Sequence, residues 1–195
     1  MKPSSVLFAG LVVCVCALGA PIAAASSATF DLSNDQWFIA DVNPSLHIGS
    51  DPSTSGLAWD GANGLPPGSV RVPDTFGWTW IGAPSSWLGD RSDAYGQNIT
   101  VDLLVRTSDG VPYPLFALRG ASLTLYVSSS EPVVGAWTQI SVPIAPGAWR
   151  VNDYAASGAA TEAQIREVLA DLRGFYIDTE WNTGPDDTSV DNIVF

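Results

Sequence analysis

Residues 161–195 read TEAQIREVLADLRGFYIDTEWNTGPDDTSVDNIVF and predict an amphipathic helix followed by two strands. Thr161 and Gln164 have the spacing of a capping box, and Gly174 is expected to end the helix. The apolar residues between them recur at helical spacing and form one stripe: Ile165, Val168, Leu169 and Leu172. We therefore expect a helix over residues 161–173 that packs its apolar stripe against a sheet.

The rest of the chain is rich in short segments with strand-like alternation. Residues 98–106 are the clearest, because Ile99, Val101, Leu103 and Val105 fall on one face. Residues 122–127, 137–142 and 175–181 continue the pattern, with turn-forming clusters between them. Many short strands and one late helix predict an all-β fold, a two-sheet antiparallel sandwich of the jelly-roll type. No linker interrupts residues 29–195, so we expect them to form one domain.

The N-terminus has the features of a secretory signal peptide. Lys2 supplies positive charge, residues 6–20 are apolar, and residues 23–25 are three alanines suited to cleavage. We expect residues 1–25 to be removed and the mature protein to be secreted and extracellular, with no membrane span. Both cysteines, Cys14 and Cys16, lie in this segment, so the mature chain is predicted to contain no thiol and no disulfide.

The composition is acidic. The net charge is −12, and Lys2 is the single lysine. Such a chain repels nucleic acid and anionic lipid, so we expect no nucleic-acid partner. The charge favours solubility, and an alternative is that several carboxylates gather around calcium.

Several segments resemble the laminin B domain, also called laminin domain IV. Residues 80–90 (WIGAPSSWLGD) and 94–97 (AYGQ), followed by the alternating strand, are similar to the opening of that family. Trp149, residues 161–174 and the closing SVDNI of residues 189–193 follow in the family's order. The resemblance covers roughly residues 29–195, a length typical of one domain. It implies a jelly-roll sandwich similar to carbohydrate-binding modules and galactose-binding-like domains, acting in extracellular adhesion or recognition without a reaction.

Two functions are weighed on these grounds. The first is a noncatalytic secreted recognition, adhesion or structural module that binds a glycan or an extracellular-matrix component. The alternative is a small carbohydrate-active enzyme, a glycosidase or lyase, because a fold does not assign a function. Asp178 and Glu180 share one face of their strand, but we interpret that face as solvated, and His47 as an ordinary loop residue. No catalytic residue is assigned, and the oligomeric state stays open.

Three further expectations concern individual residues. A structural Ca²⁺ is predicted where the first and last strands meet, with Asp31 and Asp191 as ligands; carbohydrate-binding modules of similar fold often hold calcium there. Asn98 is a glycosylation site if the host modifies secreted proteins. Five tryptophans are expected in the core, namely Trp37, Trp78, Trp80, Trp87 and Trp137. Trp149 and Trp181 lie next to turns and are expected to be partly exposed.

Overall fold

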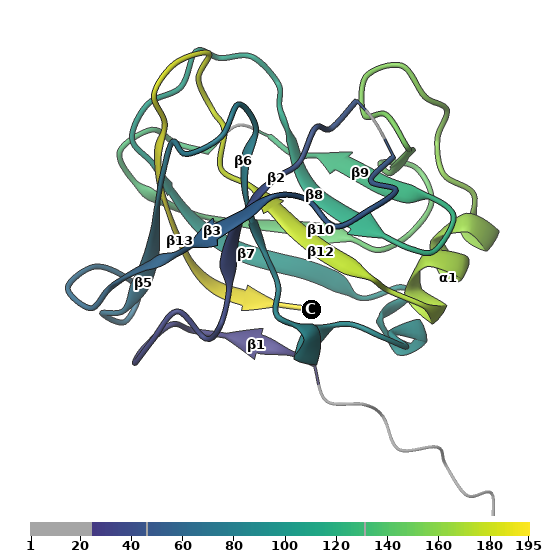
Figure 1. Ribbon diagram of the computed structural model, residues 1–195, viewed down its shortest axis with the longest axis horizontal. Helices are drawn as coiled ribbons and strands as arrows, with labels where there is room; N and C mark the ends of the chain where they lie inside the picture. Colours follow the sequence, from purple (N-terminus) through teal and green to yellow (C-terminus); the bar gives the residue numbers. More distant parts are fainter. Residues whose placement is uncertain (1–24, 46, 131) are drawn as a thin grey trace, which may run out of the picture.

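Two antiparallel sheets pack against each other in a sandwich, as predicted (Figure 1). The computed structural model describes residues 25–45, 47–130 and 132–195. Sheet A has the order β10 (Trp137–Pro143), β7 (Asn98–Val105), β13 (Asp187–Val194), β5 (Ser69–Pro73) and β4 (Ala58–Asp60), with β1 (Ser27–Ala28) beside β13. Sheet B has the order β11 (Arg150–Val151), β9 (Thr124–Ser128), β8 (Pro114–Arg119), β12 (Gly174–Asp178), β6 (Thr79–Gly82), β2 (Phe38–Asp41) and β3 (Thr54–Gly56).

The core lies between the two sheets and is built mainly by period-two alternation. Ile99, Val101, Leu103 and Val105 of β7 are all fully buried, which confirms the face assigned to them. Aromatic side chains fill the centre: Phe175 of β12 contacts the rings of Trp37, Trp87, Phe116 and Phe195. The chain therefore forms its core without disulfides, as its length allows.

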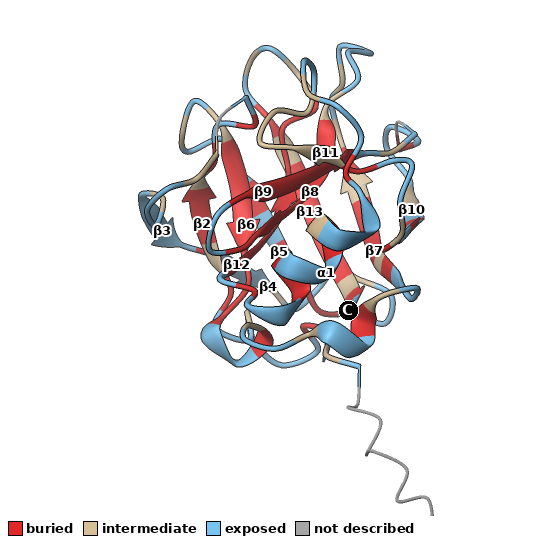
Figure 2. Cartoon of the chain, turned by 90° about the vertical axis from the view of Figure 1, so that its right-hand side faces the viewer, coloured by how far each residue is buried: buried red, intermediate tan, exposed pale blue. Residues whose placement is uncertain are grey.

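The predicted helix is α1 (Glu162–Ala170), which lies at one side of the sandwich with its outer face exposed (Figure 2). Thr161 caps it, and its side chain and that of Gln164 complete both hydrogen bonds of the capping box. Ile165, Val168 and Leu169 are buried, and Leu172 is buried just beyond the helix. The apolar stripe is therefore confirmed.

The predicted end of the helix at Gly174 is wrong. The helix ends at Asp171, after which Leu172 forms a backbone bridge with Gly89, and Gly174 begins β12. The glycine serves packing instead, since a Cβ at Gly174 would lie 2.6 Å from the ring of Tyr176. The glycine at position 174 therefore does not end the helix, because the chain already pairs with other strands before and at that residue.

The first strand pairs with the end of the last strand, β13, which is an inner strand of sheet A. Ser27 pairs with Val194, and the backbone N–H groups of Ser26 and Phe195 donate to each other's carbonyl oxygens. Asn192 adopts a positive φ of 49° where the β13–β7 register shifts, a conformation that asparagine tolerates better than most residues. The resulting bulge turns the Asn192 amide toward Leu65 O and Asp102 Oδ2.

The tryptophans are distributed differently from the prediction. Trp37, Trp80 and Trp87 are buried as expected, but Trp78 and Trp137 are only half-buried. Trp149 and Trp181 are fully buried rather than partly exposed. The Trp149 indole donates to Pro143 O, so a residue beside a turn still enters the core.

None of the helices formed by the described residues has the length and hydropathy needed to cross a bilayer.

Candidate functional site

A pocket of about 370 Å³ lies where three loops meet at one end of the sandwich. The loops join β5 to β6, β7 to β8 and β12 to β13; the last is the yellow loop at the upper left of Figure 1. We call this the loop-end pocket. Its main lining residues are Asp74, Phe76, Trp78, Tyr113, Glu180 and Asn182. Loops on a rigid sheet scaffold are where binding residues usually lie.

Asp178 is the last residue of β12, and Glu180 follows it and lines the pocket. The predicted solvated face for these two residues is wrong. The exposed fraction is 1% for Asp178 and 8% for Glu180. β12 is an inner strand of sheet B, paired with β6 and β8, and the loops close over its end. The Thr79 N–H donates to Glu180 Oε1 at 2.7 Å, and the Glu180 N–H donates to Asp178 Oδ1 at 2.9 Å. Strand alternation predicts which side of the sheet a side chain faces, but it does not predict whether loops cover that side.

Three carboxyl groups beside the pocket, those of Asp178, Glu180 and Asp186, have raised pKa values. Burial raises the pKa of Glu180 to about 7 and that of Asp186 to about 6. Asp74 adds like-charge repulsion to both. Burial also raises the pKa of Asp178 well above its usual value, with repulsion from Glu180 and Asp186 as a smaller cause.

Glu180 and Asp186 lie within hydrogen-bonding reach of each other and form a carboxyl pair. A protonated Glu180 donates to Asp186, while Asp186 Oδ1 also accepts the Trp181 N–H at 2.9 Å. Without that proton, Asp186 Oδ2 is buried and finds no donor within the described part of the chain. Two adjacent buried carboxylates resist joint ionisation, which favours the protonated form of Glu180 next to an ionised Asp186.

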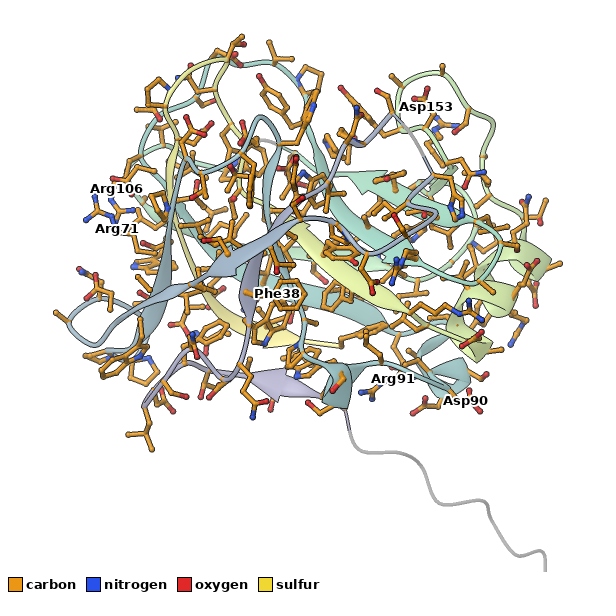
Figure 3. The ribbon with its side chains drawn as sticks, in the orientation of Figure 1. Phe38, Arg71, Asp90, Arg91, Arg106 and Asp153 are labelled. Atoms are coloured by element: carbon orange, nitrogen blue, oxygen red, sulfur yellow. The ribbon has the colours of Figure 1, made fainter. Side chains whose placement is uncertain are left out.

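The neighbouring Asp187 has the opposite electrostatic environment. Arg71 and Arg106 lie side by side (Figure 3) and both pair with it, at 2.6 Å and 3.1 Å. The Arg71 hydrogen bond is the main cause of a lowered pKa at Asp187. These two arginines are therefore engaged with Asp187 and are not among the groups that shift the pKa of Glu180 or Asp186.

Asp109 holds one wall of the pocket together. Its carboxylate accepts hydrogen bonds from the backbone and hydroxyl of Thr183, from the Tyr113 hydroxyl and from the Val111 N–H. These bonds, led by that of the Thr183 hydroxyl, lower the pKa of Asp109 to about 2. The β7–β8 and β12–β13 loops are thereby tied to each other, which fixes Tyr113 and Asn182 at the pocket wall.

A larger concavity of about 610 Å³ lies over sheet B, beside Phe38 (labelled in Figure 3), Tyr176 and Arg119. Its charged groups are paired: Arg119 contacts Asp51, and Arg173 contacts Asp171 at 2.8 Å. The loop-end pocket differs because its acids have no such partners, so we regard it as the stronger candidate site.

The two predicted calcium ligands, Asp31 and Asp191, lie close enough for their charges to interact, near the pairing of β1 with β13. Asp191 is fully buried, and burial is the main cause of its raised pKa, with Asp102 and Asp31 as smaller causes. Its two oxygens accept the Leu65 and Asn192 N–H groups at 2.7 Å each, and Asp31 is exposed. Within the described ranges, no three acidic, histidine or cysteine side chains are placed to hold a metal. A Ca²⁺ at this position would therefore have two carboxylate ligands at most, and backbone carbonyls and water would have to supply the others.

The other residues singled out by sequence lie apart from the pocket. Asn98 is exposed at the start of β7, as a glycosylation site requires. His47 is half-buried, and its Nδ1 lies 2.9 Å from the Thr124 hydroxyl. Sequence reasoning missed Asp74, Trp78 and Asp186. The adjacent acids Asp186 and Asp187 in a turn after Asp178 and Glu180 were the available signal.

Comparison with known proteins shows both a family and a similar fold. Residues 80–195 match the family described as Laminin B (Domain IV). Among solved structures, the chain is similar to the L4b domain of human laminin alpha-2, with a TM-score of 0.66 and 12% sequence identity. That match covers 87% of this chain and 96% of the laminin domain, and at this identity it shows the fold alone. A search among curated proteins found no relative.

Proposed function

Since the chain belongs to the laminin B (domain IV) family, we propose that it is a noncatalytic extracellular recognition or adhesion module. The loop-end pocket is its proposed binding surface, for a glycan or a matrix protein. The observation that carries this proposal is the carboxyl pair of Glu180 and Asp186 buried beside aromatic side chains. Burying acids without cationic partners destabilises a fold, and such groups gather at functional sites more often than elsewhere.

The same pair also supports the alternative, a glycosidase or lyase, because carboxyl groups with raised pKa values can act as general acids or bases. Its geometry is unfavourable. Glycosidase carboxyl groups stand at least about 5 Å apart with the substrate between them, whereas Glu180 and Asp186 hydrogen-bond directly. We therefore place the enzyme second.

Binding to an array of glycans and matrix proteins tests the proposal, using protein purified from culture medium. We expect one ligand class to bind, and Trp78→Ala to abolish that signal while Trp137→Ala, at another half-buried tryptophan in β10, preserves it. Both variants should show cooperative unfolding. Release of reducing ends from a polysaccharide panel, lost in Glu180→Gln, would favour the enzyme instead.

Secretion is part of the same proposal. The expected signal peptide, residues 1–25, lies outside the described residues apart from residue 25. Export is supported by the sequence pattern and by the family to which the chain belongs. The intact mass of the protein from the medium should correspond to a mature chain beginning near Ser26, without cysteine.

We also propose a structural Ca²⁺ between Asp31 and Asp191. The proximity of the two carboxylates at the meeting point of the chain ends supports it, because a divalent cation would offset their repulsion. Calcium at millimolar concentration should then raise the melting temperature, and EDTA should lower it. Equal melting curves with calcium and with EDTA would rule the site out.

A further inference from the structure

We propose that the loop-end pocket binds a cationic group, a guanidinium or ammonium, presented by a basic segment of a protein partner. This inference rests on the proposed recognition function and specifies the chemistry of its ligand. Three features carry it: the charge at the pocket, the aromatic walls and the arrangement of the acids.

Carboxyl groups converge on the pocket from separate loops. Asp74 follows β5, whereas Glu180 and Asp186 belong to the β12–β13 loop. Asp74 and Glu180 line the pocket, and Asp186, which is 7% exposed, lies next to Glu180. The nearby arginines, Arg71 and Arg106, are engaged with Asp187. The carboxyl groups of Asp74 and Glu180 at the pocket therefore have no cationic partner within the described residues, and a bound cation would supply one.

The walls suit an organic cation. Phe76, Trp78 and Tyr113 line the pocket, and aromatic faces attract guanidinium and ammonium groups. Asn182 adds an amide at the same wall. The volume of about 370 Å³ lies near the lower end of the range for small-ligand sites, which suits the end of one long side chain.

A bare metal ion fits less well. Calcium needs six to eight oxygen ligands, yet ring carbons form much of the lining. Among the described residues, no three acidic, histidine or cysteine side chains converge at this pocket to hold a metal ion. A guanidinium is satisfied by one or two carboxylates and a ring face, which is the combination present here.

Protonation should compete with this ligand. The titratable groups that interact with Glu180 are Asp74 from the β5–β6 loop, Asp178 from β12, and Asp186. Asp109 and Tyr113 from the β7–β8 loop interact with Asp186. A bound cation favours ionised Glu180, so binding should release a proton and strengthen as the pH rises through about 7.

The experiment is an NMR titration of the ¹⁵N-labelled secreted protein with Nα-acetyl-arginine amide, read at the Trp78 indole N–H. Nα-acetyl-citrulline amide is the matched probe, because it has almost the same shape without the charge. We expect arginine amide to bind at pH 8, roughly tenfold more weakly at pH 5.5, and citrulline amide to bind at least about tenfold more weakly at either pH.

Two variants and one control locate the site. Glu180→Gln keeps the acceptor for the Thr79 N–H and should weaken binding roughly tenfold. Asp74→Asn should weaken it severalfold, whereas Asp93→Asn, the same change at an exposed position in η2 (Ser92–Ala94), should leave it unchanged.

Equal binding of arginine and citrulline amides would overturn the inference, as would Ca²⁺ perturbing the Trp78 signal where arginine amide does not. Equal affinities for Asp74→Asn, Glu180→Gln and the control would overturn it too. If the array still records a Trp78-dependent ligand in any of these cases, the proposed function stands. Loss of all Trp78-dependent binding on the array would overturn the function itself.

Discussion

Replacing Leu169 with aspartate is expected to lower the free energy of unfolding by roughly 4 kcal/mol or more. Leu169 is fully buried on the inner face of α1, in the same core cluster as Leu123 and Phe175. The change removes a large apolar side chain and places a carboxylate where water cannot reach it. Chemical denaturation followed by circular dichroism measures the loss.

Ala163→Asp is the matched control, because it introduces the same charge in the same helix at an exposed position. Near the helix N-terminus an aspartate is tolerated or slightly stabilising, so the shift should stay within about 0.5 kcal/mol. If both variants unfolded at the same denaturant concentration as the wild type, α1 would not be docked on the core.

Glu180→Gln is expected to stabilise the protein at pH 8 and to have little effect at pH 5. The pKa of Glu180 in the folded protein, about 7, lies above the usual value of 4.5. Between these values the folded state binds more protons than the unfolded state, so stability is present at low pH and is lost as the pH rises toward 7. Above pH 7 the wild type holds an ionised buried carboxylate that glutamine lacks. We expect a difference of about 2 kcal/mol between the two pH values.

Thermal or urea unfolding at both pH values measures this difference. Glu167→Gln makes the same chemical change at an exposed position of α1 and is the matched control. The acids whose pKa values are lowered, such as Asp187 and Asp109, titrate below this window and do not obscure it. A parallel pH profile for wild type and Glu180→Gln would mean that Glu180 is ionised throughout.

Local patterns predicted those parts of the fold that depend on near neighbours in sequence. The capping box at Thr161 and Gln164 involves residues three positions apart, and the alternation of β7 follows from the pleat of a single strand. The end of α1 was missed because Leu172 pairs with Gly89, far away in the chain. The likeness to galactose-binding domains stays a prediction.

The sequence alone determined the class of the fold, an antiparallel two-sheet sandwich with one late helix. Hydrophobic periodicity distinguishes strands from helices, and it can be seen directly in the order of the residues. Only the tertiary structure decided which acidic residues have raised pKa values and which have lowered ones. Asp186 and Asp187 are adjacent in sequence, yet one meets Glu180 in a buried pair and the other meets Arg71 and Arg106. Burial and charge neighbours set a carboxyl group's pKa, and both depend on segments that are distant in the chain and meet only in the folded protein.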